Sequence, residues 1–105
     1  MQKKVAEFNS NKTVHKTPMP VYARIMDIQS EIGELAKEYL KISSYGTKDF
    51  KLHDDFILEY GDVLYSILSL SDELNINADL ALDKVIDKYK ARIEKQGSMG
   101  SKNNS

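Results

Sequence analysis

The segment from residue 54 to residue 74 constrains the fold more than any other part of the chain. On a helical wheel most of its circumference is apolar, through Phe56, Ile57, Leu58, Tyr60, Val63, Leu64, Tyr65, Ile67, Leu68, Leu70 and Leu74. A helix that is apolar nearly all round is normally enclosed by neighbouring helices. The polar residues share a stripe roughly 80° wide, made of Asp55, Glu59, Asp62, Ser66, Ser69 and Glu73. These confined carboxylates need a compensating cation, because a partly buried and unpaired charge is costly.

Apolar residues recur at three- and four-residue steps in other segments too, which is typical of helices. Thr17 followed by Pro18 predicts the start of a long helix that runs to about Ile42. A short helical turn is expected within the first eight residues, and a last helix to about Gln96, capped by Asn77 or Asp79. No segment reads as a strand.

The sequence therefore predicts an all-α fold, an antiparallel helical bundle with three main helices plus a short N-terminal helix, assembling into an oligomeric bundle. A chain of 105 residues has no room for a second core. We expect a single helical domain at 1–96, with its core at about 18–96, and a disordered C-terminal tail at 97–105.

Composition excludes several classes of function. The chain has no cysteine, so disulfides, thiol catalysis and thiolate metal sites are absent. No apolar run approaches the roughly 18 residues that span a bilayer, and the first residues lack a signal-peptide core, which predicts a cytoplasmic protein without a membrane partner. The formal net charge is −1, with 15 basic and 16 acidic residues, which argues against nucleic-acid binding.

The charges are segregated along the chain. From Leu52 to Asp83 there is no lysine or arginine but there are eight acids, and the basic residues Lys84, Lys88, Lys90, Arg92 and Lys95 follow at once. Lys84, Lys88 and Arg92, at steps of four, form one basic stripe suited to a triphosphate. Two interpretations stay open: the acids and bases bind a cation and an anion, or the two segments neutralise each other in the fold.

Two short motifs repeat an acid, any residue, a glycine and a second acid: "EIGE" at 31–34 and "EYGD" at 59–62. Each glycine costs a helix about 1 kcal/mol relative to alanine, and acids three positions apart repel each other. Gly33 and Gly61 would allow two helices, or a helix and a ligand, to approach closely. Facing each other, the motifs would place four carboxylates around one space, a donor set that suits Mg²⁺ or Mn²⁺.

The acids of the first long helix have a simpler explanation as well. Asp27, Glu31, Glu34 and Glu38 fall within one sector of that helix, beside its apolar face. Taken alone, this sector predicts a solvated stripe. The duplicated motif is the feature that favours a metal site.

With their spacing, these motifs resemble the MazG family of all-α nucleoside triphosphate pyrophosphohydrolases. The family's pattern is two adjacent acids followed by x-x-Glu and, after a spacer, Glu-x-x-Asp. The resemblance spans Tyr22 to Arg92, and it implies that four acids bind Mg²⁺: Glu31, Glu34, Glu59 and Asp62. The stretch "DKYKAR" is similar to the family's Lys-aromatic-x-x-Arg, which implies that Lys88 and Arg92 contact nucleotide phosphates. Ser30 departs from the pattern where the first of the paired acids is expected, and this puts a second metal ion in doubt.

The expected function is Mg²⁺-dependent hydrolysis of a nucleoside triphosphate between the α- and β-phosphates, giving a nucleoside monophosphate and pyrophosphate. Glu31 or Glu34 would position the attacking water, and Lys84, Lys88 and Arg92 would bind the substrate. The resemblance implies a house-cleaning type of enzyme that forms a homodimer or homotetramer, with base and sugar preference open.

Two other functions compete with this expectation. One is a nucleotide-binding or regulatory module with weak or no turnover, which the Ser30 departure favours. The other is a plain helical oligomerisation protein. A di-iron carboxylate bundle is disfavoured because neither histidine follows a glutamate by three positions, as its Glu-x-x-His motif requires.

Overall fold

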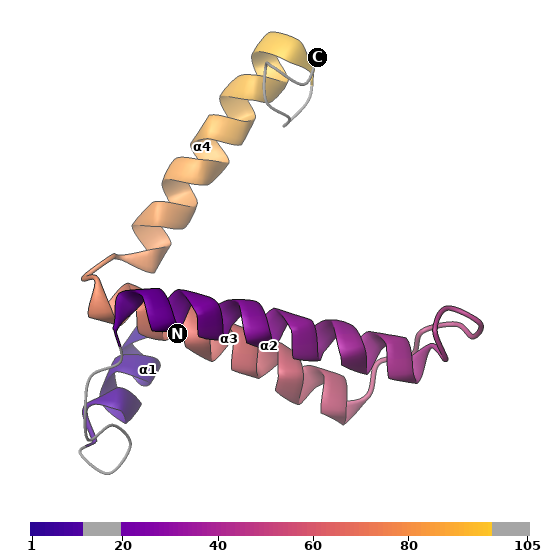
Figure 1. Ribbon diagram of the computed structural model, residues 1–105. Helices are drawn as coiled ribbons and strands as arrows, with labels where there is room; N and C mark the ends of the chain where they lie inside the picture. Colours follow the sequence, from indigo (N-terminus) through magenta and orange to yellow (C-terminus); the bar gives the residue numbers. More distant parts are fainter. Residues whose placement is uncertain (12–19, 98–105) are drawn as a thin grey trace. The chain divides into compact units, whose positions relative to one another are not determined.

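The computed structural model describes residues 1–11 and 20–97. This part of the chain forms four helices and no strand: α1 (Gln2–Asn9), α2 (Val21–Ile42), α3 (Asp54–Glu73) and α4 (Ala78–Gln96) (Figure 1). The prediction of an all-α fold with three long helices and a short N-terminal one is confirmed. The expected helix start at Thr17–Pro18 and the expected tail at 98–105 lie outside the described residues.

The helix ends follow from local chemistry. Pro20 directly precedes α2, in keeping with proline's inability to donate a hydrogen bond inside a helix. The side chain of Asn77 accepts a hydrogen bond at 3.1 Å from the Leu80 N–H and so caps α4, as expected. At the other end Gly97 adopts φ 73°, the left-handed conformation that commonly ends a helix.

The structure divides into two compact units, which are considered separately. The first is Met1–Asn75 with α1, α2 and α3, and the second begins at Ile76 and contains α4. None of the described helices combines the length and apolar character needed to cross a membrane.

In the first unit, α2 and α3 lie side by side and run antiparallel (Figure 1). The segment 43–53 that joins them packs through aromatic rings: Phe50 stacks on Tyr39 at 4.7 Å and meets Phe56 edge-on at 5.0 Å. Its chain reversal uses left-handed backbone at Ser44, Tyr45 and Gly46, with φ of 49°, 58° and 85°. Such φ values are unfavourable for residues with a Cβ, and local hydrogen bonds hold this turn: the Tyr45 N–H donates to the Leu40 carbonyl at 2.7 Å and the Gly46 N–H to Ser43 Oγ at 3.2 Å.

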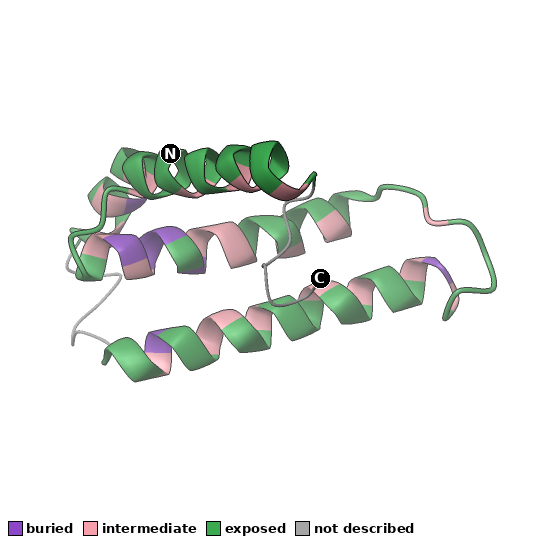
Figure 2. Ribbon diagram, turned by 90° about the horizontal axis from the view of Figure 1, so that it is seen from above, coloured by how far each residue is buried: buried purple, intermediate pink, exposed green. Residues whose placement is uncertain are grey.

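The contact between α2 and α3 has a polar part, which includes Asp27 and Glu31 of the acid sector of α2, whereas Glu34 of the same sector is exposed. Buried residues on these two helices are Arg24, Ser66, Leu68, Ser69 and Ser71. Figure 2 shows buried positions in the first part of α2 and in the second half of α3. The acid sector of α2 faces the polar stripe of α3, because Glu31 of α2 meets Glu59 and Asp62 of α3.

Many large apolar residues of this unit are exposed, although Val5 and Leu68 are buried. Large side chains that are exposed on α2 and α3 include Tyr22, Ile25, Met26, Ile32, Tyr39, Ile57, Leu58 and Tyr60. Their exposure is the reverse of what the apolar circumference of α3 suggested. Apolar surface of this extent marks a face that another element or molecule covers.

The short helix α1 packs on α3 through a small network. Asn9 donates a hydrogen bond from Nδ2 to Ser69 Oγ at 3.0 Å and accepts one from the Tyr65 hydroxyl at 2.5 Å. Phe8 meets the Tyr65 ring edge-on at 6.0 Å, and Val5 is buried. Because α1 is too short to be a stable helix alone, these contacts hold it.

Candidate metal centre

Three carboxylates from two helices converge in the first unit. Glu31 of α2 and Glu59 and Asp62 of α3 each offer one oxygen, and the three oxygens lie within 4.8 Å of one another. Glu59 and Asp62 share a face of α3 because they are three residues apart. Because like charges repel, bringing these three carboxylates together is locally unfavourable, and contacts elsewhere in the fold must offset the repulsion.

The electrostatics of the cluster favour a bound cation. The pKa of Glu31 is raised, first by partial burial and then by the neighbouring charges of Asp62, Asp27, Glu59 and Glu34. Partial burial also raises the pKa of Glu59, followed by the charges of four neighbouring acids: Asp62, Glu34, Glu38 and Asp55. Within residues 1–11 and 20–97, no ion pair reaches Glu31, Glu59 or Asp62.

The donor set fits a hard divalent cation. Three carboxylate oxygens, without nitrogen or sulfur, are the ligands that Mg²⁺, Mn²⁺ and Ca²⁺ prefer. Mg²⁺ binds oxygen at about 2.0–2.1 Å, so two of its ligands lie at most about 4.2 Å apart. The spread of 4.8 Å in the cluster is slightly wider. Small side-chain rotations would close it around Mg²⁺, and the larger Ca²⁺ would fit without them.

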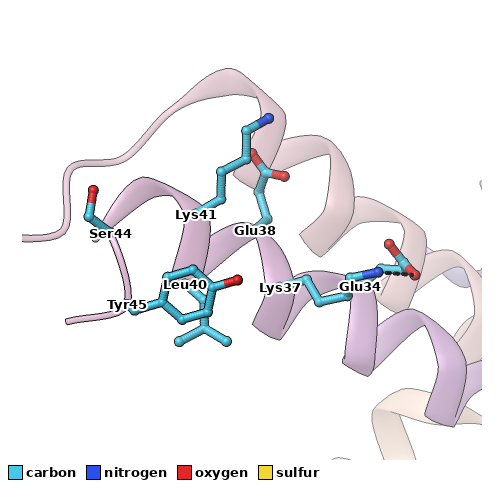
Figure 3. A pocket seen from close by; sticks show the side chains of 7 residues that line it. All are labelled: Glu34, Lys37, Glu38, Leu40, Lys41, Ser44 and Tyr45. Carbon is cyan, nitrogen blue, oxygen red and sulfur yellow. Dashed lines mark ion pairs between the residues drawn. The ribbon is translucent and has the colours of Figure 1, made fainter.

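Glu34 lies outside this group of three. Its Oε1 is 3.7 Å from Lys37 Nζ, and the two side chains are 51% and 75% exposed. Figure 3 shows this pair at the edge of a cavity of about 520 Å³. The cavity is lined by Glu34, Lys37, Glu38, Leu40, Lys41, Ser44 and Tyr45. The charge of Glu34 still raises the pKa of Glu31 and Glu59, so it is a neighbour of the cluster. Its predicted roles as a metal ligand and catalytic residue stay predictions.

The predicted substrate-binding residues all lie on α4, in the second unit. Lys88 Nζ lies 5.6 Å from the centroid of the Tyr89 ring, and Arg92 Cζ lies 6.0 Å from the same centroid. Both cations therefore flank one aromatic ring, within cation–π range. The roles of Lys84, Lys88 and Arg92 in binding a substrate stay predictions.

In the described part of the chain, neither glycine of the duplicated motif lies at a close contact between two helices. A Cβ added to Gly33 or Gly61 would meet no atom within 4 Å. Gly61 instead borders a cavity of about 330 Å³ between α1 and α3, lined by Met1, Lys4, Val5, Leu64, Tyr65 and Leu68. The expectation of close helix contact at these glycines is wrong within this unit, and close approach of a ligand or another chain remains to explain them.

Comparison with known proteins identifies a relative of the chain. Over 79 residues it is 34% identical to the uncharacterized protein YpjD of Bacillus subtilis (strain 168), and the match covers 72% of the chain and 67% of YpjD. The chain belongs to the YpjD family. No family model matches it, and no solved structure matches it. Membership of the YpjD family carries no activity with it, so the function has to be argued from the site.

In this member of the YpjD family, the structure adds residues that the motifs did not single out. Arg24 is 3% exposed and donates from Nε and Nη2 to Glu73 Oε1 at 3.3 and 3.0 Å. Its Nη1 lies 3.9 Å from Asp27 Oδ2, which accepts a hydrogen bond at 3.2 Å from the Ser66 hydroxyl. One signal could have revealed this network: Arg24 falls in the same wheel sector as the acids of α2.

Proposed function

We propose that the protein is a Mg²⁺-dependent nucleoside triphosphate pyrophosphohydrolase of the MazG type. The observation that supports this proposal is the convergence of Glu31, Glu59 and Asp62, with their oxygens within 4.8 Å of one another. Among the described residues no ion pair reaches this cluster, and the pKa values of Glu31 and Glu59 are raised. A divalent cation would stabilise such a cluster. Mg²⁺ sites of this kind keep several waters and complete their shell with substrate phosphates.

The proposed reaction is hydrolysis of the anhydride between the α- and β-phosphates. A water oxygen forms a bond to phosphorus, the bond to the bridging oxygen breaks, and the products are a nucleoside monophosphate and pyrophosphate, with the water's protons released to solvent or the products. Mg²⁺, when bound, would neutralise phosphate charge and lower the pKa of the water. Glu31 would hold the ion and orient the water, with Glu34 as the second candidate for orienting it. Glu59 and Asp62 would hold the ion from α3.

Lys84, Lys88 and Arg92 would bind the substrate through its phosphates. Four-residue steps place the three cations along one stripe of α4, and a cationic stripe stabilises charge on a departing pyrophosphate. The arginine offers a bidentate fork to phosphate oxygens, which a lysine cannot do. We propose this role on the sequence pattern and the charge of α4.

A homo-oligomer, dimer or tetramer, is the assembly that we propose. The outward-facing apolar residues of α2 and α3 support it, because soluble monomers rarely leave so much large apolar surface open to water. A second copy could cover these apolar faces without breaking the polar contacts between α2 and α3, since the polar stripes of the two helices already face each other. Sedimentation or light scattering across a range of protein concentrations would measure the mass of the particle.

A second candidate function is nucleotide binding without turnover. Two observations favour it: Ser30 replaces the first acid of the MazG-like pattern, and Glu34 is paired with Lys37. The MazG-like pattern has five acids, and three carboxylates converge here. Such a centre would hold one cation and a nucleotide but would have no further carboxylate to act as a base. Binding of a triphosphate without release of pyrophosphate would support this function.

The decisive experiment is an assay of pyrophosphate release across ribo- and deoxyribonucleoside triphosphates, with Mg²⁺ and with a chelator. Release that requires Mg²⁺ and is lost in the Asp62→Asn variant would support the enzyme. The Asp72→Asn variant, altered at an acid of α3 outside the cluster, is the matched control and should keep its activity. No release of pyrophosphate with any triphosphate, at protein concentrations where the oligomer is present, would refute hydrolysis.

A further inference from the structure

A hydrogen-bonded network lies directly beside the carboxylate cluster, and we call Arg24, Asp27, Ser66 and Glu73 the polar clamp. Arg24 joins the first turn of α2 to the end of α3 through Glu73 at 3.0 and 3.3 Å. Ser66 donates from α3 to Asp27 of α2 at 3.2 Å. These are the attractive polar contacts between the two helices, and the next contact along is the repulsive one between acids.

The clamp and the cluster occupy successive positions of one antiparallel helix pair. Glu31 comes four residues after Asp27 in α2, and Asp62 comes four residues before Ser66 in α3. Four residues advance a helix by about 6 Å and return to nearly the same face. The Asp27–Ser66 contact and the Glu31–Asp62 contact are therefore neighbouring rungs of the same interface.

This register decides whether the acids meet. Mutual repulsion of Glu31, Glu59 and Asp62 favours sliding or separation of the two helices. A slip of one helical turn, about 5.4 Å, would place Glu31 opposite Ser66 and take it away from Asp62. The Ser66 hydroxyl donates a hydrogen bond across the interface, one helical step from the repelling acids. This bond opposes the slip.

We propose that Ser66 is a positioning residue for the metal centre: its hydrogen bond to Asp27, supported by Arg24, fixes the register of α2 on α3 that brings Glu31 to Glu59 and Asp62. This inference rests on the proposed metal centre but not on hydrolysis. Ser66 does not belong to the group of carboxylates that would bind the ion. Its effect on metal binding passes through Asp27 and the helix spacing.

Three buried serines of α3 provide a matched comparison, because their hydroxyls serve three different elements. Ser66 bonds to Asp27 of α2, Ser69 accepts a bond from Asn9 of α1, and Ser71 donates to the Ile67 carbonyl of its own helix at 3.2 Å. All three are buried. Replacing each by alanine removes one hydroxyl from the same helix, and only one of the three replacements affects the α2–α3 register.

The test measures the affinity for Mn²⁺ by electron paramagnetic resonance titration of the full chain, at a temperature where circular dichroism shows every variant to be folded. Mn²⁺ is the probe because it takes the same oxygen ligands as Mg²⁺ and is visible in this spectroscopy. Loss of a group bonded directly to a metal ligand weakens metal binding about 10–100-fold. Because Ser66 acts through Asp27 and the helix register, we expect Ser66→Ala to weaken Mn²⁺ binding by up to about tenfold. Ser69→Ala and Ser71→Ala should bind Mn²⁺ as the unaltered protein does.

A second pair of variants tests the support from Arg24. Arg24→Gln should weaken Mn²⁺ binding, whereas Lys48→Gln, which removes the same charge from an exposed residue of the connecting segment, should not. An electrostatic effect alone would act in the opposite direction, because loss of a nearby cation makes the acids more attractive to a metal ion. Weaker binding in Arg24→Gln therefore reports position and not charge.

Each result decides the inference. Equal Mn²⁺ affinity in Ser66→Ala and Ser71→Ala would overturn it, and so would an unaltered protein that does not bind Mn²⁺, which would remove the metal centre too. Weaker binding in Ser66→Ala alone would support it. If the unaltered protein binds Mn²⁺ but releases no pyrophosphate, hydrolysis fails while the comparison of the serine variants still decides the role of Ser66.

Discussion

Replacing Arg24 by methionine should cost about 2 kcal/mol of folding stability, within the usual range for a hydrogen bond to a charged group. The methionine keeps much of the apolar stem that Arg24 packs against its neighbours. What is lost is the charge and the two hydrogen bonds to a single Glu73 oxygen, at 3.0 and 3.3 Å. Because both bonds share one acceptor, they are counted once.

The loss of stability depends on how far water solvates Glu73 and Asp27 once Arg24 is replaced. Breaking a fully buried ion pair typically costs about 3–5 kcal/mol, because the remaining charge stays unsolvated. Here the side chains of Glu73 and Asp27 are 26% and 38% exposed, so water recovers part of that cost. For a domain of this size, about 2 kcal/mol lowers the unfolding midpoint by roughly 8–16 °C.

Urea unfolding followed by far-UV circular dichroism, at one fixed protein concentration, measures this difference. Lys37→Met is the control, since its partner Glu34 and Lys37 itself are largely solvent-exposed and such pairs contribute about 0–1 kcal/mol. A double-mutant cycle with Glu73→Gln isolates the Arg24–Glu73 coupling. The reasoning is refuted if Arg24→Met costs no more than Lys37→Met, or if the cycle shows no coupling.

Three further predictions follow from the site. Asp62→Asn should abolish Mg²⁺-dependent pyrophosphate release and keep the helical circular dichroism, and loss of the helical signal would show instead that the acid is structural. Glu59→Gln should make the metal-free protein more stable at neutral pH but not at pH below about 4, the ordinary range of the carboxyl pKa. The sign follows from the raised pKa of Glu59: the folded state holds the proton more tightly, so its contribution to stability is present at low pH and is lost as pH rises through the folded pKa. Urea unfolding at several pH values checks this, and an equal effect at all pH values would contradict it. Gly33→Ala should stabilise the helix by about 0.5–1 kcal/mol, because the added Cβ meets no atom within 4 Å; a loss of stability or of the oligomer would reveal a close neighbour from another chain.

Periodicity and capping residues predicted the helices well. The sequence predicted that α2 ends at about Ile42, that α3 starts at about Asp54 and that Asn77 or Asp79 caps α4; the structure has the two boundaries there and Asn77 as the cap. These signals are local: a break in apolar spacing, an Asn side chain that satisfies a free N–H, and a connecting segment too short for anything but an antiparallel return.

Burial was harder to predict, because it depends on which face a helix turns to its neighbour. The apolar positions Tyr22, Ile25 and Ile32 recur at helical spacing in the sequence, yet they are exposed in this unit. Hydrophobic patterns assume that apolar faces meet within one chain. In this unit the polar stripes meet instead, through Arg24 and Ser66 among others, and a pattern read along one chain does not show which partner covers the opposite faces.

The site was predicted in part for the same reason. Spacing alone indicated that four carboxylates could face each other, those of Glu31, Glu34, Glu59 and Asp62. In the structure Glu31, Glu59 and Asp62 converge, and Glu34 lies outside their group. The sequence could not show that Glu34 pairs with Lys37, three residues away, because helical spacing allows both the pair and a turn toward the cluster.

The antiparallel step between Asp27–Ser66 and Glu31–Asp62 limits which changes in chain length this protein can tolerate. One residue inserted between Asp27 and Glu31 would rotate every later side chain of α2 by about 100° and aim its carboxylates away from α3. The same insertion in the segment 43–53 would merely enlarge a surface loop, at a small entropic expense. Homologous chains that keep the carboxylate cluster should therefore differ in length between these helices and not inside them.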